Sequence, residues 1–258
     1  KGMKIDDSLE EEIEDIIDSS KINELIAINE KIGVAKNGEY LVAEYIDFIV
    51  DTFKSSILKN VKDDFKVLID TANGATYKIA DEIFTKLNIP HDVINNTPDG
   101  ININKNCGST HLDMLKEQVV EKGYTLGIAY DGDGDRCLVI DSSGRVIDGD
   151  ILLAIFSSYL KENGKLNKDT LVATVMSNLG LSNYAKENEL NLIKTKVGDR
   201  YVLEEMLKNG YNLGGEQSGH IIFLDYNPTG DGILTSLMLI QILLEKNKIL
   251  YEMANIMK

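Results

Sequence analysis

Short apolar runs alternate with longer amphipathic stretches along most of the chain. Runs such as 66–70, 126–130 and 171–175 are short and rich in branched apolar side chains, and they predict buried β-strands. Between such runs, apolar residues recur at helical spacing. In 39–59 this spacing predicts a helix with one buried face, formed by Leu41, Val42, Tyr45, Ile46, Ile49, Val50 and Phe53. The alternation predicts an α/β protein whose helices pack against its sheets.

The length and the pattern together predict two domains. At 258 residues the chain exceeds one ordinary domain, and each half is long enough to bury a core. Residues 19–38 are mixed in character and predict a linker, after an acidic helix whose N-cap is predicted at Ser8. Gly144 turns a hairpin that ends near residue 147, where we expect the domain boundary, because the strand–helix alternation begins again beyond it.

Two polar loops interrupt the alternation. Residues 99–111 predict a long loop, and one interpretation is a structural loop held by asparagine side chains. Residues 211–220 predict a glycine-rich loop ahead of a strand at 221–224. Just before it, Asp199 is predicted to cap a helix that ends at Gly210.

Charge and composition exclude several classes of protein. A net charge of −15 argues against a nucleic-acid surface and against an anionic membrane. The two cysteines, Cys107 and Cys137, lack metal-ligand spacing and predict a reducing compartment without disulfides. The longest apolar run, 233–244, is interrupted by polar residues and is too short to span a bilayer. We therefore expect a cytoplasmic protein with no nucleic-acid partner and no membrane partner.

The acidic stretch 131–136 is the strongest candidate for chemistry. Its carboxylates, Asp131, Asp133 and Asp135, lie between two predicted strands and repel one another, a penalty that a bound cation removes. Ligands that are all oxygen suit Mg²⁺ before Ca²⁺. A plain hairpin turn is the alternative. An EF-hand calcium loop is excluded because Arg136 and Ser142 stand where that loop needs Gly and Glu.

A basic group and a polar loop provide two further candidates. Lys194, Lys196 and Arg200 flank a predicted helix N-terminus, where lysine and arginine favour phosphate binding; an ordinary capped helix with solvated lysines is the alternative. In the loop 214–220, alternate polar side chains could bond sugar hydroxyls or a phosphate. These side chains belong to Glu216, Ser218 and His220. A nucleophilic role for the serine is disfavoured because Glu, not Gly, precedes it by two residues.

Together, the stretches 131–136 and 215–220 closely resemble the α-D-phosphohexomutase superfamily, in which the first is the Mg²⁺-binding loop and the second the sugar-binding loop. Three more stretches resemble its bacterial phosphoglucosamine mutases in particular. They are 102–111, 175–180 and 195–201. Phosphomannomutase and phosphoglucomutase relatives typically have Met in place of Gln217 and His in place of Asp199.

The resemblance implies two consecutive three-layer α/β/α domains with mixed sheets, the second and third domains of these enzymes. Residues 38–147 would form the domain with the metal loop, and residues 148–258 the domain with the sugar loop. Residues 1–37 would be the tail of the first domain and a linker. The Ser-His-Asn-Pro loop that carries the family's phosphoserine does not occur in the sequence. We therefore expect a central fragment that is inactive alone.

The activity implied by the resemblance is the interconversion of glucosamine 6-phosphate and glucosamine 1-phosphate, a step in amino sugar metabolism toward cell-wall precursors. It proceeds through a phosphoserine enzyme and a bisphosphate intermediate, and the full-length enzyme could form a homodimer. The acidic loop would hold Mg²⁺, with Arg136 supporting phosphoryl transfer. Glu216, Ser218 and His220 would bind the sugar, beside a wall formed by Lys196, Asp199 and Arg200. The alternatives are a phosphomannomutase/phosphoglucomutase fragment, or a truncated paralogue that binds phosphosugars without catalysis.

Overall fold

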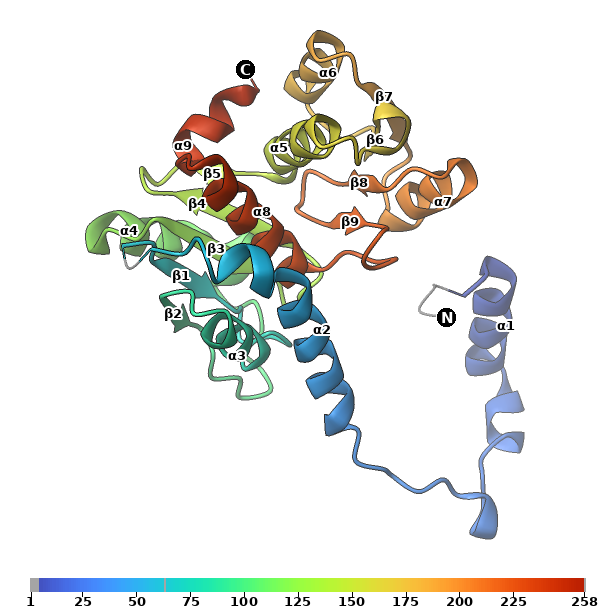
Figure 1. Ribbon diagram of the computed structural model, residues 1–258. Helices are drawn as coiled ribbons and strands as arrows, with labels where there is room; N and C mark the ends of the chain where they lie inside the picture. The colour runs from blue at the N-terminus through green and yellow to red at the C-terminus, as the bar shows by residue number, and fades with distance from the viewer. Residues whose placement is uncertain (1–4, 63, 258) are drawn as a thin grey trace. The chain divides into compact units, whose positions relative to one another are not determined.

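The computed structural model describes residues 5–62 and 64–257, and its internal contacts divide the chain into two units, 1–44 and 45–258. The described part of the first unit contains α1 (Asp7–Asp18) and two short 3-10 turns, Ser20–Glu24 and Asn29–Lys31 (Figure 1). Helix α1 follows Asp6, so the N-cap predicted at Ser8 is wrong: Ser8 lies inside the helix.

The first sheet of the second unit has five strands in the order β2-β1-β3-β4-β5. Strand β1 is parallel to β2 and β3, whereas β4 is antiparallel to β3 and β5, so the sheet is mixed. Strand β2 was not predicted, and its outer position explains its weaker apolar pattern. The bounds are β1 (Val67–Asp70), β2 (His91–Ile94), β3 (Leu126–Tyr130), β4 (Cys137–Asp141) and β5 (Val146–Ile147).

The second sheet has four strands in the order β7-β6-β8-β9 and is also mixed. Its bounds are β6 (Thr170–Thr174), β7 (Asn191–Thr195), β8 (Leu213–Gly215) and β9 (Ile221–Phe223). Strand β8 occupies part of the predicted loop 211–220, so that prediction is partly wrong. Leu213 is buried there and pairs with Phe223, which gives this short segment the cross-strand partner that a strand needs.

Eight helices of the described chain follow α1. They are α2 (Glu39–Ile57), α3 (Ile79–Lys86), α4 (Asp113–Lys122), α5 (Gly149–Glu162), α6 (Leu179–Glu187), α7 (Asp199–Asn209), α8 (Gly232–Lys246) and α9 (Leu250–Met253). The cap predicted at Asp199 is wrong, because Gly198 occupies that position with φ +124° and Asp199 is the first helical residue. Asp148 and Asp231 cap α5 and α8 with their side chains. No described helix combines the length and apolar character that crossing a bilayer requires.

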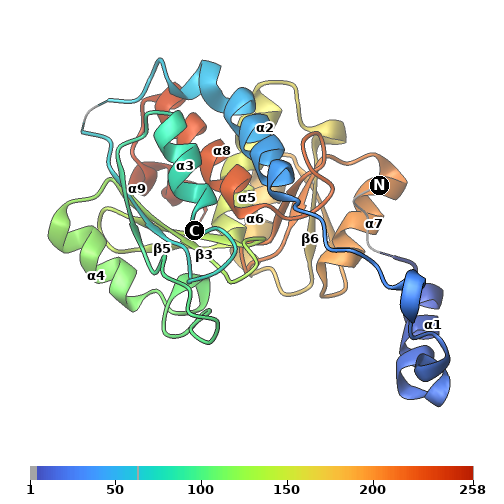
Figure 2. The ribbon, with the colours of Figure 1, turned by 90° about the horizontal axis from the view of Figure 1, so that it is seen from below.

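Each sheet of the second unit is covered on both faces. One face of the first sheet packs against α2, α3 and α8, and the other against Leu115 and Val119 of α4. In the second sheet, α5 and α6 cover one face, while Val202 and Met206 of α7 cover the other. Helices α8 and α5 contact each other and join both sheets into one core (Figures 1 and 2).

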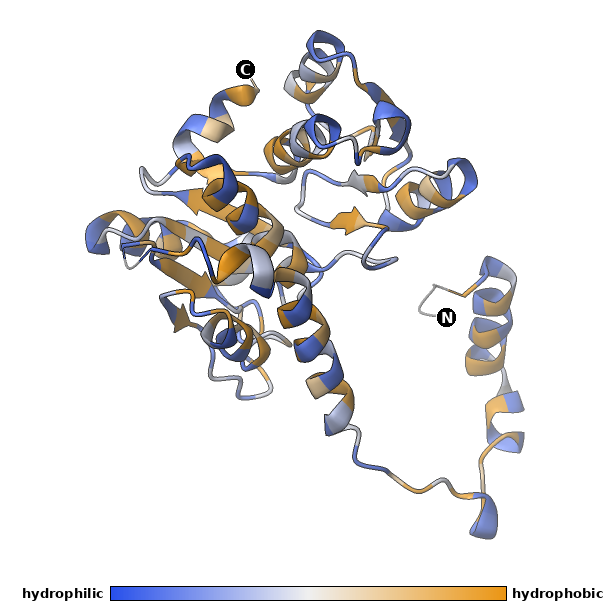
Figure 3. Cartoon of the chain, viewed as in Figure 1, coloured by the Kyte–Doolittle hydropathy of each residue, from blue (hydrophilic) through white to orange (hydrophobic). Residues whose placement is uncertain are grey.

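The burial of side chains follows this layering. Strands β1 and β9 are coloured as hydrophobic in Figure 3, and every residue of both is buried. The structure confirms the predicted α/β/α architecture with mixed sheets. It buries one face of α2 at Ile46, Ile49 and Phe53, but it leaves Leu41 and Val42 exposed, contrary to the face predicted for this helix.

Candidate functional site

The acidic loop connects β3 to β4, with its three carboxylates on one side. One carboxylate oxygen from each of Asp131, Asp133 and Asp135 lies within 4.8 Å of the other two. Among the described residues, this is the group of acidic, histidine or cysteine side chains that is close enough to hold a metal ion. Donors that are all oxygen fit a hard divalent cation such as Mg²⁺.

Backbone hydrogen bonds fix the course of this loop. The carbonyl oxygen of Gly132 accepts the N–H of Ala75 at 2.8 Å, and that of Gly134 accepts the N–H of Gly232 at 2.9 Å. Gly134 has φ +80°, a left-handed conformation that glycine adopts without strain. The loop is therefore held from two sides, by the turn after β1 and by the first residue of α8.

Burial makes the carboxyl groups of Asp131 and Asp135 harder to ionise than those of exposed aspartates. The pKa of Asp131 is raised to about 6, mainly by burial and also by the charges of Asp135 and Asp133, while a hydrogen bond from the Arg136 N–H lowers it. Burial also raises the pKa of Asp135, with the charge of Asp133 adding to the effect. A bound cation would offset both causes, so the electrostatics of the loop fit a cation site.

The predicted sugar loop lies between β8 and β9. Glu216 accepts the N–H of Gly198 at 3.2 Å through its carboxylate, which ties the loop to the start of α7. The main-chain carbonyl oxygen of Gln217 accepts the N–H of Gly149 at 2.9 Å, and the side-chain amide of Gln217 donates to the carboxylate of Asp148 at 3.3 Å. Ser218 is exposed. The loop is thus anchored by its neighbours while its serine remains accessible.

The structure brings the acidic loop and the sugar loop into direct contact. Arg136 and His220 form an isolated antiparallel β-bridge, and the N–H of Cys137 donates to the carbonyl oxygen of Gly219 at 3.0 Å. A side chain at Gly219 would place its Cβ 2.4 Å from the carbonyl oxygen of Cys137, so only glycine allows this approach. Two segments that are far apart in sequence therefore form one continuous site.

His220 lies at the centre of that site. Its side chain is 3% exposed, and its Nε2 lies 3.5 Å from an oxygen of Asp135 and 3.6 Å from an oxygen of Asp199. Three residues predicted from separate motifs are therefore neighbours. Burial of the ring restricts the direct contact with a sugar that was expected for this histidine.

The cations of the candidate site contact different partners. The Nε of Arg136 lies 3.8 Å from Asp131 and 3.9 Å from Asp135. Lys194 donates to the carbonyl oxygen of Ser177 at 3.4 Å. Lys196 lies 5.8 Å from the centre of the Tyr201 ring, and Arg200 pairs with Glu204 at 2.9 Å. The phosphate role predicted for this basic group stays a prediction.

Sequence reasoning missed the residues that surround the acidic loop on its other side. A hollow of about 430 Å³ adjoins Asp133 and Asp135. Its other lining residues are Tyr45, Ala75, Thr76, Ile79, Gly134, Thr229, Gly230, Asp231 and Ile233. The sequence did contain a signal, because Gly230 and Gly232 flank an acidic helix cap, a pattern that indicates close backbone contacts.

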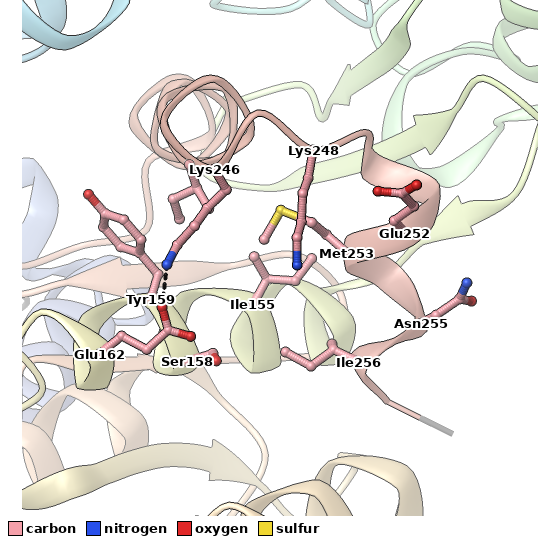
Figure 4. A pocket seen from close by; sticks show the side chains of 11 residues that line it. Ile155, Ser158, Tyr159, Glu162, Lys246, Lys248, Glu252, Met253, Asn255 and Ile256 are labelled. Atoms are coloured by element: carbon pink, nitrogen blue, oxygen red, sulfur yellow. Dashed lines mark hydrogen bonds and ion pairs between the residues drawn. The ribbon is translucent and has the colours of Figure 1, made fainter.

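A second hollow, of about 290 Å³, lies between α5, α8 and α9 (Figure 4). Its wall includes the ion pair of Lys246 with Glu162, and Tyr159 stands at one side. It contains none of the candidate residues predicted from the sequence.

Comparisons with curated proteins identify relatives along the whole chain. A phosphoglucosamine mutase of Clostridium tetani is 49% identical over 257 residues, and one of Acetivibrio thermocellus is 51% identical over 260 residues. Both alignments cover 100% of this chain and 56% of the relative. The chain thus spans a little over half the length of these curated relatives.

Solved structures share the fold. A phosphoglucomutase/phosphomannomutase family protein of Burkholderia thailandensis matches with a TM-score of 0.70 at 23% identity, over 84% of this chain and 46% of that one. An N-acetylphosphoglucosamine mutase of Aspergillus fumigatus, in complex with GlcNAc-6P and magnesium, matches with a TM-score of 0.67 at 18% identity, over 83% of this chain and 53% of that one.

Two sequence profiles match adjoining parts of the chain. Residues 43–144 match phosphoglucomutase/phosphomannomutase α/β/α domain II, and residues 148–258 match α/β/α domain III. These ranges contain the acidic loop and the sugar loop respectively, and β5 lies in the short gap between them. The chain therefore belongs to the phosphoglucomutase/phosphomannomutase family, of which it contains α/β/α domains II and III.

Proposed function

We propose that this chain is the central part of a phosphoglucosamine mutase, an enzyme that interconverts glucosamine 6-phosphate and glucosamine 1-phosphate. Curated phosphoglucosamine mutases about half identical to the whole chain support this substrate. The observation that carries the proposal is the contact between the acidic loop and the sugar loop, which includes the backbone hydrogen bond from Cys137 to Gly219. Phosphoryl transfer to a sugar requires a cation site and a sugar site side by side.

Asp131, Asp133 and Asp135 would hold Mg²⁺ in this enzyme. The ion supplies positive charge that offsets the charge developing on a transferring phosphoryl group. The protein contributes the geometry, because backbone hydrogen bonds at Gly132 and Gly134 hold the loop that carries the carboxylates. Arg136, 43% exposed at its side chain, can reach out from the same loop toward an anionic substrate.

The loop 214–220 would orient the sugar. Ser218 is exposed and can both donate and accept hydrogen bonds. Glu216 already accepts the N–H of Gly198, and its carboxylate retains capacity to accept from sugar hydroxyls. His220 would act by joining Asp135 to Asp199 at the back of the site. Lys196 and Arg200 would complete the adjoining wall.

The purified 258-residue chain is expected not to interconvert the two glucosamine phosphates. The proposed reaction needs a phosphoserine, and the Ser-His-Asn-Pro loop that would carry it does not occur in this sequence. A coupled assay with glucosamine 1-phosphate as substrate measures this directly. Formation of glucosamine 6-phosphate above the rate without protein would show that the chain contains its own nucleophile.

Mg²⁺ is expected to bind the chain weakly, and the Asp131→Ala/Asp133→Ala variant is expected not to bind it. Isothermal titration calorimetry with MgCl₂ compares the two proteins. Affinity should also fall as the pH drops below about 6, because the raised pKa of Asp131 lets a proton compete with the ion there.

The control for this titration is Asp113→Ala, which removes an exposed carboxylate at the start of α4, away from the acidic loop. It should bind Mg²⁺ as the unsubstituted chain does. Equal heats from the unsubstituted chain and the double variant would overturn the metal site and, with it, the proposed function.

A further inference from the structure

The acidic loop is held on one side by the start of α8, and a partly buried contact from another helix holds that start in place. We propose that Tyr45 and Asp231 are positioning residues for the metal loop, acting through the first peptide N–H of α8. This inference rests on the proposed function, because it assumes that the loop binds Mg²⁺.

The first step is the bond between α8 and the loop. Gly232 is the first residue of α8, so its N–H has no acceptor within the helix, and it donates to the carbonyl oxygen of Gly134 at 2.9 Å. The positive end of the helix dipole thus lies against a loop of three carboxylates and stabilises their negative charge. Eleven residues of α8 are buried, so the helix is a fixed support.

The second step is the close packing of residues 230–232 against the site. A Cβ at Gly230 would lie 2.4 Å from the His220 ring and 2.8 Å from the carbonyl oxygen of Asp135. A Cβ at Gly232 would lie 2.6 Å from the carbonyl oxygen of Arg136. Because these segments are in direct contact, a shift of residues 230–232 toward the site must displace the acidic loop.

The third step is what holds Asp231, the residue between these two glycines. Asp231 is 7% exposed, and its carboxylate caps α8 by accepting the N–H of Leu234 at 2.9 Å. It also accepts the hydroxyl of Tyr45, at 3.0 and 3.1 Å to its two oxygens, and the amide of Asn227 at 3.4 Å. Tyr45 lies on α2, 186 residues away in sequence, so its hydroxyl orients the cap from a separate element.

The test measures Mg²⁺ affinity of the full chain by calorimetry, together with its thermal unfolding. Tyr45→Phe removes the hydroxyl and is expected to weaken Mg²⁺ binding about tenfold, the lower end of the range for groups that support metal ligands. Tyr159→Phe is the matched control. The hydroxyl of Tyr159, on α5, donates to Glu245 of α8 at 2.6 Å, and Tyr159 lines the other hollow (Figure 4). Loss of this hydroxyl should leave the Mg²⁺ affinity unchanged.

A second variant tests the route through the cap. Asp231→Ser retains an N-cap side chain for α8 but is too short to keep the bond to Tyr45, so it should weaken Mg²⁺ binding as Tyr45→Phe does. If the tyrosine acts through the aspartate, the double variant should bind no more weakly than either single variant.

Each other outcome overturns the inference. Unchanged Mg²⁺ affinity in Tyr45→Phe would show that the tyrosine does not position the loop. Equal weakening in Tyr159→Phe would show that the loss of affinity reflects general destabilisation of the fold. Additive losses in the double variant exclude the route through Asp231. In all three cases the proposed function stands, provided that the unsubstituted chain binds Mg²⁺ and Asp131→Ala/Asp133→Ala does not. Failure of the unsubstituted chain to bind Mg²⁺ overturns both.

Discussion

Gly149→Ala is expected to displace the sugar loop and to destabilise the second unit by about 3 kcal/mol or more, the upper end of the cost of overpacking. A Cβ at this position would lie 2.0 Å from the carbonyl oxygen of Glu216 and 2.9 Å from that of Gln217. Both are backbone atoms, so no side-chain rotation can relieve the clash. Denaturant unfolding measures the loss, and hydrogen exchange of residues 214–220 measures the displacement.

Gly33→Ala is the control for this substitution. No atom would lie within 4 Å of its Cβ, and its backbone does not need glycine, so stability should not fall. An alanine at 149 that left both the unfolding midpoint and the exchange of the loop unchanged would contradict the close packing of α5 against the loop.

Phe53→Ala is expected to cost about 3–5 kcal/mol, the usual range for removing a fully buried phenylalanine. Its ring is 0% exposed and belongs to the core that α2 shares with the first sheet and α8. Because Tyr45 lies on the same helix, loosening α2 should also weaken Mg²⁺ binding. Chemical denaturation gives the first quantity and calorimetry the second.

Phe48→Ala provides the comparison on the same helix. Its ring is 42% exposed, so truncation removes little buried area and should change stability by less than about 1 kcal/mol. Similar losses in the two variants would mean that α2 packs differently from the arrangement described above.

The acidic loop and its place between two strands could be predicted from sequence because the signal is local. Two apolar runs that flank three carboxylates within five residues indicate a strand–loop–strand unit, and the mutual repulsion of the carboxylates makes the loop a candidate cation site. The caps at Asp148 and Asp231 are local for the same reason, since a cap depends on the next three residues.

Features that depend on distant partners could not be predicted in this way. Strand β8 contains two glycines in three residues, and it exists because Val172 and Phe223 supply its neighbours. The bond from Tyr45 to Asp231 joins residues 186 positions apart. The cap at α7 was misplaced because aspartate suits both a cap and a first turn, and the conformation of Gly198 decides between them.

The backbone bond from Cys137 to Gly219 ties the acidic loop to the sugar loop, and the one from Gly149 to Gln217 ties the sugar loop to the start of α5. Separating the loops would break main-chain hydrogen bonds in a closely packed interior. In the proposed reaction, a phosphosugar bound at these loops would therefore face a surface whose two halves move together.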